Sequence, residues 1–188
     1  MAGPASLPFT DDDAANRLLA TDPLALLIGM LLDQQFPMER AFFSPFLLHQ
    51  RLGGTLDAGA IASMNEEDLV EVFQGPPALH RFPGSMATRT RAMCEAVVAD
   101  YAGDPSAIWS TATDGRELLK RLEALPGFGK AKSRIFVGVL GKRLGAGPPG
   151  WEEAAADWPS IADVDSFEKV FELREHKRAM KAAKKASP

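Results

Sequence analysis

The sequence predicts an all-α protein, and two observations support this fold class. Apolar residues recur at helical spacing in segments that start with capping residues and stop at glycine or proline, such as 38–51 before Gly53-Gly54. The chain shows no convincing run of alternating apolar and polar residues, which would indicate strands. With 188 residues it can bury one sizeable core or two small lobes.

The helices expected in the first half have recognisable starts. Asp11 to Asp13 can cap a helix through Leu19, and Pro23 suits the first turn of a helix to about Gln34. This second helix is apolar nearly all round, so we expect it at the centre of the core. Further helices are expected at 38–51, 56–62 and 65–73, the last opened by Asn65.

The second half begins with a proline-rich loop at 75–84, which reads Gly-Pro-Pro-Ala-Leu-His-Arg-Phe-Pro-Gly. A helical tail is expected at 166–186, and it contains seven basic and three acidic residues. Between them, helices are expected at 86–101, 104–110, 115–124 and 130–143.

Composition and charge limit the class of protein. A net charge of −4, with 46% hydrophobic and 24% charged residues, is typical of a soluble globular protein. The single cysteine, Cys94, excludes a disulfide framework or a cysteine-ligated metal site within one chain. The start, Met1 to Asp13, does not resemble a signal peptide, and the apolar run 24–32 is too short to span a membrane. We therefore expect a cytoplasmic protein with no membrane partner.

The segment 125–132, Leu-Pro-Gly-Phe-Gly-Lys-Ala-Lys, joins two expected helices. Its glycines permit positive φ and close approach to a sugar-phosphate strand, and the phenylalanine between them is expected to point inward. Free N–H groups at the start of the second helix form a phosphate site. Residues 116–143 carry a local charge of +6, which indicates an anionic partner. The alternative is an ordinary helical connection. The candidate DNA-binding residues are Gly127, Phe128, Gly129, Lys130, Lys132 and Arg134.

Three segments in this order resemble the helix-hairpin-helix (HhH-GPD) superfamily of DNA glycosylases, the group containing endonuclease III and 3-methyladenine DNA glycosylase II. They are Pro23 to Gln35, the helix start Met86 to Arg91, and the hairpin 125–129. The resemblance covers roughly 23–145 and implies a two-lobed helical fold with a DNA-binding cleft between the lobes. Within the single unit 1–188, one lobe would be mainly 23–115, and the other 1–22 with 116–188. The four-cysteine loop of endonuclease III is absent, so no iron–sulfur cluster is expected.

The resemblance implies base-excision repair of double-stranded DNA. Such enzymes extrude the damaged base and cleave its N-glycosidic bond, with a carboxylate stabilising the charge that develops on the sugar. Bifunctional members use a lysine two residues after the second glycine, where this chain has Ala131. Lys130 and Lys132 are each offset by one residue, or about 100° around a helix, so a monofunctional, hydrolytic enzyme is expected.

The catalytic carboxylate is the feature that departs most from the family pattern. The family places an aspartate after an apolar residue at a helix start, and the nearest fit is Asp165, thirty-six residues after Gly129. Asp163 is the second candidate. The alternative role for Asp165 is a helix N-cap, with Glu168 completing a capping box. The alternative function is a non-catalytic DNA-binding relative that recognises duplex distortion.

The remaining candidates surround the expected damaged base. Gln34 and Gln35 would fill the gap left by the base or read the opposite strand; alternatively they are a polar helix end. His80 and Arg81 would contact phosphate or base, or be merely solvated. No metal site is expected apart from a monovalent cation at the hairpin. We expect a monomer, associated with the nucleoid. A helical interaction module without a DNA role is the third reading, and the identity of the damaged base stays open.

Overall fold

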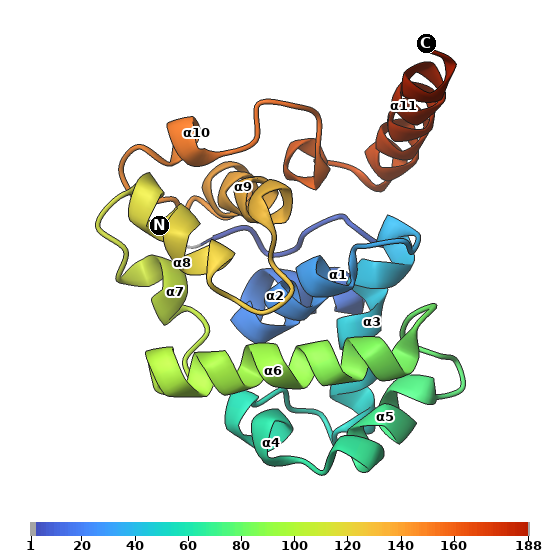
Figure 1. Cartoon of the computed structure of the whole chain (residues 1–188), viewed down its shortest axis with the longest axis vertical. Coiled ribbons are helices and arrows are strands. Elements are labelled where there is room, and N and C mark those ends of the chain that lie inside the picture. The colour runs from blue at the N-terminus through green and yellow to red at the C-terminus, as the bar shows by residue number, and fades with distance from the viewer. Residues whose placement is uncertain (1–2, 188) are drawn as a thin grey trace.

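The structure is a computed structural model that describes residues 3–187, leaving Met1, Ala2 and Pro188 outside the description. All regular structure in the described range is helical, so the all-α prediction is confirmed (Figure 1). The elements are α1 (Asp13–Thr21), α2 (Pro23–Leu32), α3 (Met38–Arg51), α4 (Ala58–Ser63), α5 (Glu66–Gln74), α6 (Pro83–Tyr101), α7 (Ala107–Ser110), α8 (Gly115–Glu123), α9 (Lys130–Gly138), the π-helical turn η1 (Val139–Arg143), α10 (Trp151–Ala154), the 3-10 turn η2 (Ile161–Asp163) and α11 (Phe167–Ala186).

Helix α2 is the centre of the core, as expected. Asp22 caps it by accepting hydrogen bonds from the N–H groups of Leu24 and Ala25, at 2.9 and 3.2 Å. Every residue from Leu24 to Leu32 is buried. A Cβ atom at Gly29 would lie 2.8 Å from Phe42, so glycine allows α2 and α3 to pack closely. The buried apolar side chains form one continuous cluster that extends along the chain from α1 to α11.

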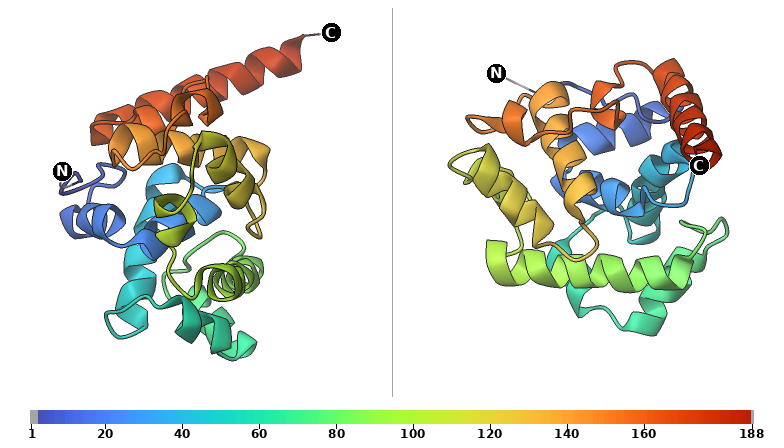
Figure 2. Two further views of the ribbon diagram at one scale, coloured as in Figure 1. Left: turned by 90° about the vertical axis from the view of Figure 1, so that its left-hand side faces the viewer. Right: turned by 45° about the horizontal axis from the view of Figure 1, so that its top comes forward.

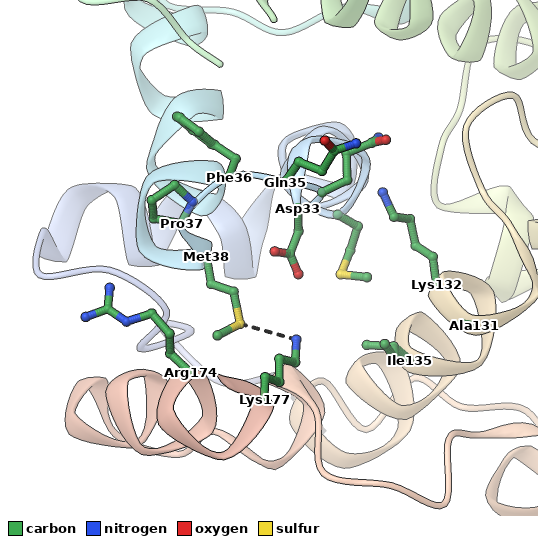
Figure 3. A pocket seen from close by; sticks show the side chains of 12 residues that line it. Asp33, Gln35, Phe36, Pro37, Met38, Ala131, Lys132, Ile135, Arg174 and Lys177 are labelled. Atoms are coloured by element: carbon green, nitrogen blue, oxygen red, sulfur yellow. Dashed lines mark hydrogen bonds between the residues drawn. The ribbon is translucent and has the colours of Figure 1, made fainter. Parts of the chain in front are cut away.

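Helix α2 ends two residues earlier than expected, at Leu32 rather than Gln34. Asp33 leaves the helical region at φ −74°, ψ 68°, and Gln35 adopts a left-handed φ of 51°. The chain therefore reverses direction here before α3 begins. After this reversal, residues 33–37 line one side of the space between α2, α9 and α11 (Figure 3).

The elements from α8 to η2 pack against one another, and the hairpin and the start of α9 contact the end of α2 at Leu31. Asp114 caps α8 by accepting from the N–H of Glu117 at 2.8 Å. The expected helix 130–143 is α9 followed by the wider turn η1, where Gly141 lies against Trp151. The short turns α10 and η2 were not expected, because the region after residue 145 has no helical periodicity. Helix α11 runs across the top of the left view of Figure 2, where its C-terminal end projects beyond the rest of the molecule.

Candidate nucleic-acid interface and active-site cavity

The hairpin between α8 and α9 is closed by backbone hydrogen bonds. The N–H of Leu125 donates to Leu122, and the N–H of Phe128 donates to Leu125, at 3.0 and 3.1 Å. Phe128 is 4% exposed and packs edge-on against Phe136, with ring centroids 6.1 Å apart. Phe128 thus anchors the hairpin inward, as expected, and presents its backbone rather than its ring to the surface.

The two hairpin glycines serve different purposes. Gly127 has a φ of +85°, a conformation that favours glycine, and a Cβ atom there would lie 2.2 Å from Leu31 Cδ1, which would have to move. Gly129 has a φ of −81°, so it does not use the positive φ that glycine permits. A Cβ atom at Gly129 would meet nothing within 4 Å. The backbone at Gly129 therefore faces open space that a ligand strand can approach.

The first turn of α9 has free donors. Gly129 is its N-cap and accepts from the N–H of Ser133 at 2.9 Å, but it has no side chain to cap the turn. Among residues 3–187, no acceptor contacts the backbone N–H groups of Lys130, Ala131 and Lys132. Unpaired N–H groups at the positive end of a helix dipole form an anion site.

The three basic side chains expected at the phosphate lie in different environments. Lys130 is exposed beside the free N–H groups. Arg134 donates to the carbonyl of Ala155 at 2.8 Å, and its guanidinium lies 4.9 Å from the Trp158 ring centre. Lys132 Nζ donates to the carbonyl of Leu31 at 2.8 Å. Lys130 is therefore placed for a phosphate contact, whereas Arg134 and Lys132 point back toward the protein.

A cavity of about 430 Å³ lies beside the hairpin (Figure 3). Its walls come from the end of α2 and the following turn, from the first two turns of α9, and from α11. Ala131 and Lys132, which carry two of the free N–H groups, are also part of this wall. The polar and charged side chains that line it are Asp33, Gln34, Gln35, Lys132, Arg174 and Lys177.

Asp33 and Lys132 give the cavity an acid–base character. Burial raises the pKa of the Asp33 carboxyl, and the nearby Lys177 and Lys132 ammonium groups oppose this rise. Burial likewise lowers the pKa of Lys132 to about 8, against the attraction of Asp33. A carboxylate and an amine with perturbed pKa values in one cavity are typical of a catalytic site. Asp33 was not among the residues predicted from the sequence. Its position directly after the apolar segment 24–32 could have indicated it, because Asp33, unlike Asp12 and Asp22, caps no helix start.

The turn at the cavity mouth is held by Gln34. Its backbone carbonyl accepts from His80 Nε2 at 3.0 Å, and its side-chain carbonyl accepts from Arg89 at 3.0 Å. His80 Nδ1 accepts from the N–H of Phe82 at 3.0 Å, which requires the neutral imidazole. Gln35 is exposed.

His80 is 2% exposed and Arg81 is exposed, so the alternative of a solvated pair fits Arg81 and not His80. Burial lowers the pKa of the His80 imidazole. The ring also packs against Phe36, with centroids 4.6 Å apart. His80 therefore positions the turn from within the protein, while Arg81 reaches solvent.

The two expected catalytic aspartates lie outside this cavity. Asp163 accepts from Lys142 Nζ at 2.6 Å and from the N–H of Ser160 at 2.9 Å, closing a capping box at η2. Asp165 is exposed and pairs with Lys169 at 2.6 Å. The N-cap of α11 is Ser166, so the capping role considered for Asp165 is wrong. Neither aspartate is brought together with Lys132.

The chain matches no protein-family model, curated protein or solved structure. Residues 3–187 contain no group of three or more histidine, cysteine or acidic side chains that could hold a metal ion. In the same range no single helix is long and apolar enough to cross a membrane; α1 and α2 reach that level only as a pair bent by 110°.

Proposed function

We propose that this protein is a base-excision DNA glycosylase of the helix-hairpin-helix type, which hydrolyses the N-glycosidic bond of a damaged base. The observation that carries the proposal is that Ala131 and Lys132 belong both to the free N–H turn of α9 and to the cavity wall. A strand held at the hairpin would therefore pass beside the cavity. Its volume of about 430 Å³ falls within the roughly 300–1,000 Å³ usual for small-molecule sites.

The hairpin would anchor double-stranded DNA through its backbone. The N–H groups of residues 130–132 and the Lys130 ammonium would bind phosphate, with a monovalent cation bridging hairpin carbonyls and phosphate. Such contacts position a duplex without reading its sequence. In this proposal residues 23–115 form one lobe and the cleft lies between it and the hairpin lobe. Gln35, exposed on its left-handed turn, would enter the gap that the extruded base leaves.

The chemistry would fall to Asp33 and Lys132. The Asp33 carboxylate would stabilise the positive charge on the sugar and orient the attacking water. The Lys132 ammonium would donate a proton to the leaving base. Because its pKa is about 8, most Lys132 side chains carry that proton at pH 7 and are poor nucleophiles. Water then adds to the sugar carbon as the bond to the base breaks, and the Asp33 carboxylate accepts the proton that this water gives up, as expected for a monofunctional enzyme.

A non-catalytic DNA-binding relative is the second candidate. The observation that favours it is the pairing of Asp163 with Lys142 and of Asp165 with Lys169, away from the cavity. Such a protein would use the same hairpin to recognise distorted duplexes without cleaving a bond.

A panel of single-lesion duplexes tests both candidates. It should contain an alkylated purine, uracil or an oxidised base at one position, with an undamaged duplex as the control. The proposal predicts salt-dependent binding and alkali-labile abasic sites on at least one member. Binding without abasic sites on any member supports the non-catalytic relative. No binding at any salt concentration contradicts both.

A further inference from the structure

The part of α11 that follows Lys177 is free of the protein body. The first half of the helix is held by the buried Val170 and Leu173 and by the ion pair of Arg174 with Glu39 at 2.7 Å. Every residue from 175 to 187 is exposed, and Met180 is 61% exposed. Figures 1 and 2 show this part of the helix projecting beyond the neighbouring elements. Intramolecular packing therefore does not explain its sequence.

The basic residues of this segment share one face. At about 100° per residue, all of them from 174 to 185 fall within an arc of about 120°. Glu172 and Glu175 lie outside that arc, and alanines occupy most of the opposite face. The Glu175 carboxylate pairs with Arg178 at 2.8 Å, so one acidic side chain reaches the edge of the basic face. Like charges at spacings of three and four residues disfavour an isolated helix, and an anionic partner would remove that cost. We call this face the basic stripe: Arg174, Lys177, Arg178, Lys181, Lys184 and Lys185.

The basic stripe starts at the cavity. Arg174 and Lys177 line the same cavity as Lys132, and Lys177 Nζ lies 3.6 Å from Met38 Sδ at its rim (Figure 3). From there the stripe continues outward to Lys185. The helix rises about 16 Å from Arg174 to Lys185, which is about the length of five base pairs. A polyanion that reaches the cavity can therefore continue along the stripe.

We propose that the basic stripe is a second DNA-backbone site, which extends the bound duplex on one side of the damaged base. This inference rests on the proposed DNA binding. The hairpin and the stripe border one cavity, so a duplex fits both better than an unrelated polyanion. Because the stripe leaves the cavity in one direction, binding depends on duplex length on one side of the lesion only.

The test removes the outer charges without touching the cavity. The variant Lys181→Gln/Lys184→Gln/Lys185→Gln is compared with Ala179→Gln/Ala183→Gln/Ala186→Gln, which alters the opposite face and keeps every charge. Circular dichroism and thermal melting check that both variants stay folded. The probes are two duplexes that each carry one tetrahydrofuran analogue of an abasic site. Each duplex has about 5 base pairs on one side of the analogue and about 20 on the other. The short arm is on the 5′ side in one duplex and on the 3′ side in the other.

Wild type and the alanine-face variant should bind one of the two duplexes more tightly than the other, and the affinity for that duplex should depend more steeply on salt. The lysine variant should lose that preference, with the slope of log K against log salt smaller by up to about 3, or about 0.9 per lost phosphate contact. An unchanged slope and preference in the lysine variant overturn the inference. An equal loss of affinity for both duplexes in the lysine variant also overturns it. The same holds if the lysine variant loses binding to phosphatidylserine vesicles but keeps its binding to both duplexes. Wild-type protein that binds neither duplex contradicts the proposed DNA binding itself.

Discussion

The side-chain amine of Lys132 donates a 2.8 Å hydrogen bond to the backbone carbonyl of Leu31, joining the first turn of α9 to the end of α2. This contact holds Lys132 in the wall of the cavity that Asp33 also lines (Figure 3). The hairpin and the candidate acid–base pair are thus parts of one structural unit.

The two hairpin glycines should separate stability from DNA binding. Gly127→Ala forces a left-handed conformation, at a cost of about 1–2 kcal/mol, and its Cβ would also meet Leu31. It should therefore lower the melting temperature by several degrees. Gly129→Ala places a methyl group in open space, so it should melt near wild type and weaken binding to all duplexes alike. Thermal melting measures the stability of both variants, and fluorescence anisotropy measures their affinity for DNA. An unaltered affinity of Gly129→Ala for a lesion duplex would contradict the proposed hairpin interface.

Lys132 should give the folding free energy a characteristic pH dependence. Its folded pKa of about 8 lies below the ordinary value of 10.5, so between these values the unfolded chain binds more protons. The cost of burying the charge is fully present below pH 8 and is relieved as pH rises to 10.5. Wild type should gain stability relative to Lys132→Met across that window in urea titrations. The exposed Lys130→Met is the matched control. A stability difference between wild type and Lys132→Met that does not change with pH would show that the amine is not buried when folded.

The pH–rate profile should distinguish a proton donor from a nucleophile. If Lys132 donates a proton, single-turnover base release falls as pH rises above about 8. An attacking amine would instead give a rate that increases up to that pH. Borohydride should trap no protein–DNA adduct at pH 7 on a processed substrate. A strong adduct that disappears in Lys132→Met but not Lys130→Met would reverse the assignment.

His80 should make the cavity turn sensitive to acid. Its folded pKa lies below the ordinary 6.5 because of burial, so protons bind the unfolded chain more readily. Stability from the neutral ring is complete above pH 6.5 and is lost as pH falls toward the lower folded pKa. Wild type should lose more stability between pH 7 and 5 than His80→Gln does. Urea midpoints at each pH provide the measurement, and parallel losses in the two proteins would argue against a neutral His80 in the fold.

Local sequence patterns predicted most of the helices, but the directions of the side chains at the candidate site depend on tertiary packing. The segment 38–51 and the cap at Asn65 follow from neighbouring residues, and the structure reproduces both. The position of His80 and the direction of Lys132 depend on contacts between residues 46 and 101 positions apart, which periodicity does not encode. Lys132 was assigned to phosphate because the sequence places it at a helix start. Its direction depends on where α2 lies.

The central claim, that base release occurs at Asp33 beside the hairpin, is tested most directly by single-turnover base release from the lesion duplex that wild type processes. Asp33→Asn removes the carboxylate charge from the cavity and should slow release about 10²–10³-fold, without lowering the melting temperature, because burial already disfavours that charge. Asp163→Asn and Asp165→Asn, whose carboxylates pair with lysines outside the cavity, should stay within a few-fold of wild type. Full activity in Asp33→Asn together with a large loss in Asp165→Asn would contradict the account.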